Sequence, residues 1–135
     1  MNGGAGILDL PPYAQSLGIA VERSDDGLPL LALAFDGKVE GRPGYLHGGA
    51  IGGLLEMAAF TALRAELLRR GTAAAIKPVN VTVEYLRGGI RQTTYARGRV
   101  IRAGRRIANL SAEAWQDDPA KPIATAWMNV LLADG

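Results

Sequence analysis

The chain has 135 residues, a length typical of one domain, and its hydrophobic fraction of 48% is sufficient for a core. Its net charge of +2 is too small to indicate a nucleic-acid-binding protein. The absence of cysteine and the single histidine exclude disulfides, thiolate metal sites and a histidine-rich metal site. The first residues lack the features of a signal peptide, and no uncharged run is long enough to span a bilayer. We therefore expect a cytoplasmic protein without membrane or nucleic-acid partners.

The N-terminal part is predicted to be an arm followed by a β-hairpin, within a single domain that spans residues 1–135. Residues 1–16 are rich in glycine and proline and form the expected arm. Two apolar runs follow, Ile19–Arg23 and Pro29–Phe35, and both are typical of strands. Between them, Ser24–Gly27 has the composition of a turn.

One long helix is predicted from about Gly49 to Arg70. Its apolar residues cover more than one stripe, and its polar residues gather near its end. A helix that is apolar on most sides must be wrapped by other structure.

Four strands are predicted after the helix, at residues 79–85, 92–101, 107–115 and 122–132. Their hairpin-like spacing favours an antiparallel meander. The predicted architecture is α+β, with one long central helix wrapped by an antiparallel sheet of five to six strands. Such a sheet has edge strands, so we expect pairing with a second copy.

A single acidic residue interrupts the apolar helix. From Gly48 to Leu63, Glu56 is the only charged side chain. An isolated carboxylate is costly to bury, so Glu56 is a candidate general base or nucleophile, or else a structural acid at a subunit seam. His47, the only histidine, and the glycines Gly48 and Gly49 stand at the helix start, where backbone N–H groups can point at a ligand.

The order of elements and this motif resemble the hotdog-fold acyl-CoA thioesterases, specifically the PaaI-like and 4-hydroxybenzoyl-CoA thioesterase group. The resemblance extends from about Leu17 to Leu132. Its most specific part is His47 followed by two glycines and by Glu56 nine positions later. Two further matches are Tyr85-Leu86-Arg87, similar to the family's Phe-Leu-Arg-Pro, and Gly104-Arg105-Arg106, similar to the turn near the coenzyme A nucleotide.

The resemblance implies hydrolysis of an aryl-, short-chain or medium-chain acyl-CoA to the free acid and coenzyme A. Coenzyme A is then part of the substrate, and neither a metal nor another cofactor is needed. The Gly48 N–H would hold the thioester carbonyl oxygen, Glu56 of a partner subunit would act as general base or nucleophile, and His47 would orient the loop. The implied assembly is a homodimer with shared active sites, associating further into a homotetramer.

The substrate-binding residues that follow from the resemblance lie in the loop and in the second half of the chain. They are Gly49, Asn80, Arg87, Arg102, Gly104, Arg105 and Arg106. With the resemblance, Arg102, Arg105 and Arg106 at the turn are expected to bind the phosphates of coenzyme A; the alternative is a solvated strand face. For Arg97 and Arg99 we expect a solvated strand face, and we expect Trp115 and Trp127 in the core or at an interface.

Four positions depart from the family pattern. Gly41 stands where an Asn or Gln usually positions water or the thioester, and Asn80 stands where an Asp is frequent. Pro78 replaces a Ser or Thr, and Phe60 replaces the Thr of the arthrobacter type. Loss of the amide at Gly41 supports an alternative function, a non-catalytic acyl-CoA-binding protein. A second alternative is a hotdog hydroxyacyl dehydratase, although there a Phe-Pro follows the histidine rather than Gly-Gly.

Overall fold

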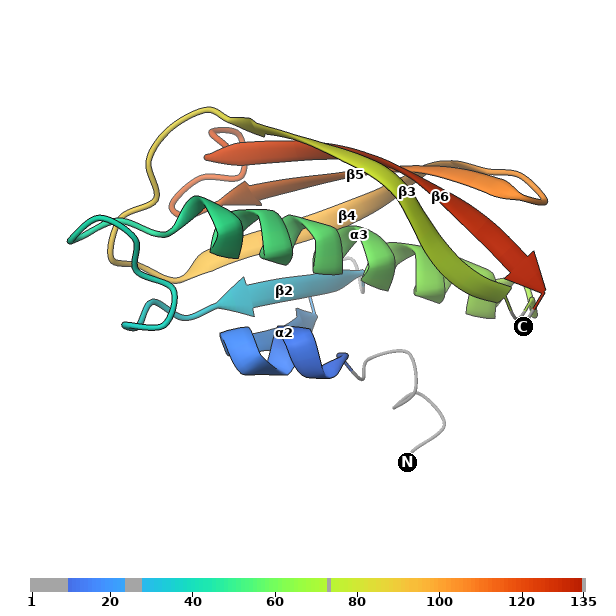
Figure 1. Cartoon of the computed structure of the whole chain (residues 1–135), viewed down its shortest axis with the longest axis horizontal. Helices are drawn as coiled ribbons and strands as arrows, with labels where there is room; N and C mark the ends of the chain where they lie inside the picture. The colour runs from blue at the N-terminus through green and yellow to red at the C-terminus, as the bar shows by residue number, and fades with distance from the viewer. Residues whose placement is uncertain (1–9, 24–27, 73, 135) are drawn as a thin grey trace.

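The computed structural model describes residues 10–23, 28–72 and 74–134. These contain α2 (Pro12–Leu17), β1 (Ile19–Arg23), β2 (Pro29–Leu33), α3 (Gly48–Arg69), β3 (Ala74–Tyr85), β4 (Thr94–Ala103), β5 (Ile107–Trp115) and β6 (Ala124–Asp134) (Figure 1). The expected turn at residues 24–27 and the first nine residues of the expected arm lie outside the described residues. Residues 12–16 of that arm form most of α2 instead.

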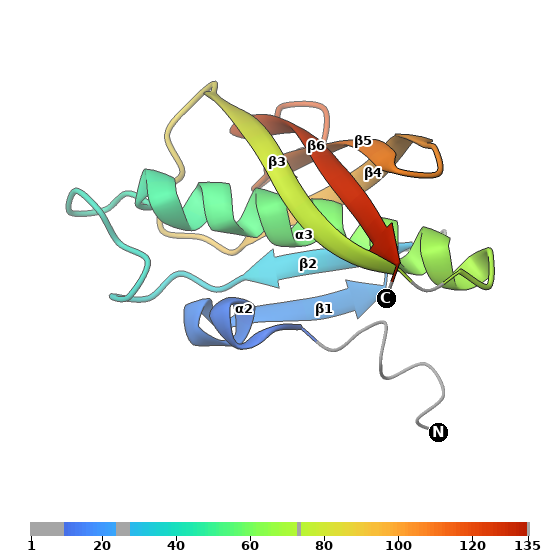
Figure 2. The ribbon, with the colours of Figure 1, turned by 45° about the vertical axis from the view of Figure 1, so that its right-hand side comes forward.

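The six strands form one antiparallel sheet that curves around α3 (Figures 1 and 2). The strand order is β1-β2-β4-β5-β6-β3, so β1 and β3 are the two edges. This arrangement confirms the predicted α+β hotdog architecture and the predicted β1–β2 hairpin.

The predicted meander is wrong for one strand, because β3 pairs with β6 and not with β4. The residues after β3 do not turn back on it. Leu46 donates a backbone hydrogen bond of 2.9 Å to the Gly89 carbonyl oxygen, and Leu86 donates one of 2.8 Å to Ile123. The first bond holds the segment after β3 against the loop that enters α3, and the second holds it against the residue before β6. The chain then passes β6 and β5 before β4 begins between β5 and β2.

The core lies between α3 and the inner face of the sheet. The helix buries residues on most of its sides: Ala50, Ile51, Gly53, Leu54, Leu55, Met57, Ala58, Ala59, Thr61, Leu63 and Leu67. Strand β4 approaches so closely that a Cβ at Gly98 would overlap the backbone of Ala58. Within the described ranges, neither helix combines the length and the apolar character needed to cross a membrane.

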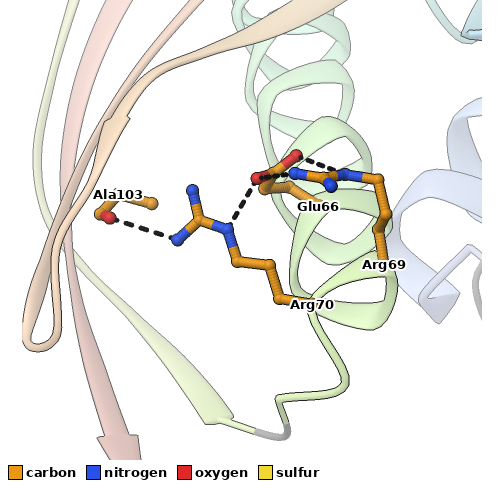
Figure 3. Close-up of polar contacts among 4 residues, drawn as sticks. All are labelled: Glu66, Arg69, Arg70 and Ala103. Atoms are coloured by element: carbon orange, nitrogen blue, oxygen red, sulfur yellow. Dashed lines mark hydrogen bonds and ion pairs between the residues drawn. The ribbon is translucent and has the colours of Figure 1, made fainter.

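An ion-pair cluster fixes the end of α3 to the sheet (Figure 3). Glu66 accepts hydrogen bonds of 2.6 Å from Arg69 and 2.7 Å from Arg70. These bonds lower the pKa of the Glu66 carboxyl below its ordinary value. Arg70 also donates to the Ala103 carbonyl oxygen at 3.2 Å, which ties the helix to the end of β4.

Candidate active site

The first turn of α3 leaves one backbone donor without an internal acceptor. His47 is the N-cap residue, and its Nδ1 accepts a hydrogen bond of 2.8 Å from the Gly49 N–H. The His47 N–H bonds Val39, and the Ala50 N–H bonds the His47 carbonyl. Among the described residues no acceptor is recorded for the Gly48 N–H, which stands at the positive end of the helix and can receive a ligand oxygen.

The N-cap bond also fixes the tautomer of the histidine. Because Nδ1 of His47 accepts from Gly49, the proton of the neutral imidazole lies on Nε2. The His47 side chain therefore ties the end of the entry loop to the first turn of α3.

A groove of about 450 Å³ opens beside this helix start, between the loop that enters α3 and the segment that follows β3. Its walls bring together three predicted site residues, His47, Gly48 and Arg87, but not Glu56. It is lined by Gly41, Arg42, Tyr45, Leu46, His47, Gly48, Ile51, Tyr85, Leu86, Arg87, Gly88 and Gly89. The lining contains no acidic residue and two arginines, so it suits an uncharged or anionic ligand.

Tyr85, at the end of β3, lies against two glycines of α3. Its hydroxyl donates a hydrogen bond of 2.9 Å to the Gly48 carbonyl oxygen. A Cβ at Gly48 would lie 3.6 Å from the ring, and one at Gly52 would lie 3.4 Å from the hydroxyl. The neighbouring Gly53 faces the other way, where its Cβ would crowd Tyr13 of α2 at 2.5 Å. Gly52 thus allows Tyr85 of β3 to pack closely on one side of the helix, and Gly53 allows Tyr13 of α2 to pack closely on the other.

Glu56 lies on the same stripe of α3 as Gly48 and Gly52, because residues four apart share a helix face. Its side chain is half-buried, and no hydrogen bond or ion pair with another described residue is recorded for it. Eight residues separate it from Gly48, which corresponds to about 12 Å along the helix axis. One glutamate side chain cannot cover that distance, so a single chain does not bring this carboxylate to the Gly48 N–H.

The predicted phosphate-binding turn lies at the opposite end of the molecule from the start of α3 (Figures 1 and 2). Gly104 closes the turn with a backbone bond of 2.9 Å to Ile107. Arg105 and Arg106 line a second groove, of about 550 Å³, together with Lys77 of β3. Sequence reasoning missed Lys77, which reaches these arginines only through the pairing of β3 with β6.

Arg102 and Asn80 do not line the first groove. Arg102 is exposed near the end of β4, beside a register shift. Asn80 lies on the outer face of the sheet, where its side chain accepts a bond of 2.9 Å from Asn129, which in turn accepts one of 2.5 Å from Asn109. These three residues form an asparagine ladder across β3, β6 and β5, so the structure does not bring Asn80 to the helix start.

The backbone path explains the glycine at position 41. A Cβ there would lie 3.0 Å from the Cα of His47, closer than side chains ordinarily pack. The neighbouring Arg42 packs on Tyr45, with its guanidinium 4.6 Å from the centre of the ring. A side chain at position 41 would therefore press against the N-cap histidine, which would have to shift by a few tenths of an ångström.

Comparison with solved structures finds relatives of the same fold. A protein from Chromobacterium violaceum is 35% identical, with a TM-score of 0.72, and the match covers 96% of this chain and 88% of that one. A phenylacetic acid degradation-related protein from Ralstonia eutropha is 21% identical over 96% of each chain, with a TM-score of 0.74. A Bacillus halodurans protein solved with CoA is 15% identical over 93% of this chain and 80% of that one, with a TM-score of 0.77.

The sequence comparisons point to one family. No curated protein sequence matches the chain. The family model described as the thioesterase superfamily matches residues 43–123, which include the histidine cap, the whole of α3 and the β4–β5 turn. The chain therefore belongs to the thioesterase superfamily.

Proposed function

We propose that this protein hydrolyses an acyl-CoA thioester to a carboxylic acid and free coenzyme A. The observation that carries the proposal is the Gly48 N–H at the start of α3, for which the described part of the chain records no acceptor, beside a groove lined by no acidic side chain. Membership of the thioesterase superfamily supports the reaction class. The Bacillus halodurans protein of the same fold was solved with CoA, which supports coenzyme A as the carrier.

The Gly48 N–H is the proposed donor to the carbonyl oxygen of the thioester. Negative charge develops on that oxygen as the carbonyl carbon becomes tetrahedral, and the helix dipole reinforces the donor. One such donor contributes about 3 kcal/mol in comparable acyl-transfer sites. The His47 cap supports this role, because it uses the next N–H group and holds the loop in place.

Glu56 is the proposed general base or nucleophile. As a base it removes a proton from water, whose oxygen attacks the carbonyl carbon. The carbon–sulfur bond then breaks, and the thiolate of coenzyme A takes up a proton. As a nucleophile it forms an anhydride that water hydrolyses. Both routes need the carboxylate within reach of the carbon held at Gly48.

Because the Glu56 carboxylate must reach the thioester carbon held at Gly48, we propose a homodimer. Glu56 lies about 12 Å along the helix from Gly48 of its own chain. The edge strand β3 exposes 57% of Val79 and 44% of Val81, and exposed apolar residues on an open edge favour pairing. Two antiparallel β3 edges would set the α3 helices antiparallel, with Glu56 of the partner subunit facing each Gly48.

The same pairing would bring the β4–β5 turn, which lies far from Gly48 of its own chain, close to Gly48 of the partner subunit. A two-fold axis reverses the ends of the chains, so each turn falls at the end where the partner's entry loop lies. Lys77, Arg105 and Arg106 supply three cations to one groove there. Cations of this kind bind phosphate oxygens, so the groove is the proposed site for the phosphates of coenzyme A.

The acyl group is proposed to occupy the groove beside Gly48. Tyr45, Ile51 and Tyr85 contribute aromatic and aliphatic walls. Such walls favour an aryl or short acyl group that packs against flat rings.

A panel of aryl-, phenylacetyl- and aliphatic-CoA thioesters tests the proposal, with free thiol as the readout. Wild-type protein is expected to release thiol, and Glu56→Gln is expected to reduce the rate at least about a hundredfold, since it keeps the shape but removes the base. Unchanged turnover in Glu56→Gln would assign the chemistry to another group. Binding without thiol release would establish the non-catalytic acyl-CoA binder instead.

A further inference from the structure

The groove beside Gly48 has two walls that come from segments far apart in the sequence. One wall belongs to the entry loop between β2 and α3 (residues 34–47), and the other to the connector between β3 and β4 (residues 86–93). The backbone bond of 2.9 Å from the Leu46 N–H to the Gly89 carbonyl oxygen joins them at the groove itself. The width of the groove therefore depends on how the entry loop is held against the connector.

Two residues outside the groove lining, Glu40 and Arg91, join the same two segments through their side chains. The Arg91 guanidinium donates a hydrogen bond of 3.1 Å to the Glu40 carboxylate. The guanidinium also lies 5.8 Å from the centre of the Phe35 ring, within the range of a cation–π contact. One side chain of the connector thus contacts the entry loop at two points.

The Glu40 carboxylate also fixes the shape of the entry loop. The same oxygen, Oε2, accepts the bond from Arg91 and a bond of 2.7 Å from the Gly44 N–H. The preceding residue, Val39, is fully buried and accepts a bond of 2.7 Å from the His47 N–H. A displacement of Glu40 would therefore move both the groove wall and the residue that caps α3.

The connector is in turn held by the sheet through Gln116, which directly follows β5. The Gln116 side chain accepts a bond of 3.1 Å from the Ile90 N–H and donates one of 3.0 Å to the Ile90 carbonyl oxygen. It also donates a bond of 3.0 Å to the hydroxyl of Thr94, a fully buried residue of β4. Because Arg91 lies between these anchored residues, its bond to Glu40 holds the entry loop to a fixed part of the molecule.

We propose that Glu40 and Arg91 are a positioning pair that sets the width of the groove and thereby selects the acyl group by size. Neither residue lines the groove, so both act through the residues of its walls. Without the pair the entry loop can move away from the connector, and the wider groove favours a bulky acyl group over a small one. The proposal rests on the proposed acyl site beside Gly48, but not on hydrolysis.

Equilibrium binding of two stable ketone thioethers tests the proposal without turnover. S-phenacyl-CoA carries a phenyl ring where S-acetonyl-CoA carries a methyl group, and titration calorimetry gives both dissociation constants. Glu40→Gln keeps an acceptor for the Gly44 N–H but removes the charge, and Arg91→Met keeps an unbranched side chain. Each is expected to raise the preference for the phenacyl ligand about two- to fivefold, the range expected of a partly exposed ion pair. The double variant should exceed neither single variant, because the pair is already broken in each.

Glu113→Gln is the matched control, because it breaks an ion pair with Arg99 in which neither residue lines the groove. The side chains of that pair are 30% and 61% exposed, against 25% for Glu40 and 66% for Arg91. A lower melting temperature with an unchanged preference, additive effects in the double variant, or an equal change in Glu113→Gln would overturn the proposal. Failure of wild type to bind either thioether would overturn it together with the acyl site, whereas binding without thiol release from the matching thioesters would refute hydrolysis alone.

Discussion

The Tyr85 hydroxyl donates a hydrogen bond of 2.9 Å to the Gly48 carbonyl oxygen, which joins the end of β3 to the first turn of α3. Gly48 is thus held through its carbonyl oxygen by Tyr85 of the edge strand β3, and its N–H is the group proposed to bind the ligand. Tyr85 lines the groove as well. We infer that it positions the oxyanion donor without taking part in the chemistry.

Tyr85→Phe removes only this hydroxyl and keeps the ring over Gly48 and Gly52. A single hydrogen bond contributes about 0.5–1.5 kcal/mol, so kcat is expected to fall about two- to tenfold with little change in KM. Steady-state hydrolysis of a preferred acyl-CoA measures both constants. The control is Tyr95→Phe on β4, which alters a tyrosine whose ring centre lies 6.4 Å from that of Trp115 on β5. An equal loss in both variants would contradict a specific role for Tyr85.

The backbone at Gly41 leaves little room for the amide that the resemblance places there. Gly41→Ala is expected to reduce activity and to destabilise the fold by about 1–3 kcal/mol, because the new Cβ pushes against His47. Gly41→Asn is expected to be no more active than Gly41→Ala. Thermal unfolding together with thiol release measures both effects. A gain of activity in Gly41→Asn would show that the loop tolerates the side chain and that our account of the glycine is wrong.

The β4–β5 turn is expected to affect KM only for substrates that carry the coenzyme A nucleotide. Arg105→Ala combined with Arg106→Ala is expected to raise KM for an acyl-CoA at least about tenfold, since bonds to charged groups contribute about 1.5–3 kcal/mol. The same variant should hydrolyse the matching N-acetylcysteamine thioester, which lacks the phosphates, as well as wild type does. Arg23→Ala on β1 is the control. Equal losses on both substrates would remove the phosphate role.

The approach of β4 to α3 at Gly98 is expected to be intolerant of any side chain. Gly98→Ala forces a methyl group against the backbone of Ala58, so the fold should lose about 3 kcal/mol or more. Gly37→Ala is the matched control, because no atom lies within 4 Å of the added Cβ. Urea unfolding of both variants measures the difference. Equal stability would mean that β4 can move away from the helix at little cost.

The α+β architecture, one helix wrapped by an antiparallel sheet, could be predicted from sequence because its signals are local. The apolar character of α3 on most sides indicated a wrapped helix, and alternation indicated the strands. The partner of β3 could not be predicted, because hairpin spacing reports neighbours along the chain. The observed pairing joins residues far apart in the chain, such as Ile76 of β3 and Leu132 of β6.

The site was predictable where it is continuous in sequence and not where the fold assembles it. The motif from His47 to Glu56 is local, and its N-cap and the Gly48 N–H at the helix start follow from helix geometry. Lys77 lies 28 positions before Arg105 and joins it only through strand pairing. The close approach of the backbone at Gly41 to the Cα of His47 could not be predicted from the motif, because it depends on the path of the folded chain.

The most direct test of the account mixes two inactive variants, Glu56→Gln and Gly48→Pro. Gly48 is the first helical residue, where proline is tolerated, and His47 has the extended conformation that precedes proline, with φ −68 and ψ 135. The substitution therefore removes the N–H group, whereas Gly48→Ala retains it and serves as the control, because its Cβ would make only ordinary contact with Tyr85.

In a site shared between subunits, a mixed dimer has one site that carries both substitutions and one that carries neither. After subunit exchange of equal amounts, activity is predicted to recover to about a quarter of the wild-type value, because half of the dimers are mixed and each has one intact site. A mixture that stays inactive after exchange is confirmed by mass spectrometry would contradict a site built from Gly48 of one chain and Glu56 of the other.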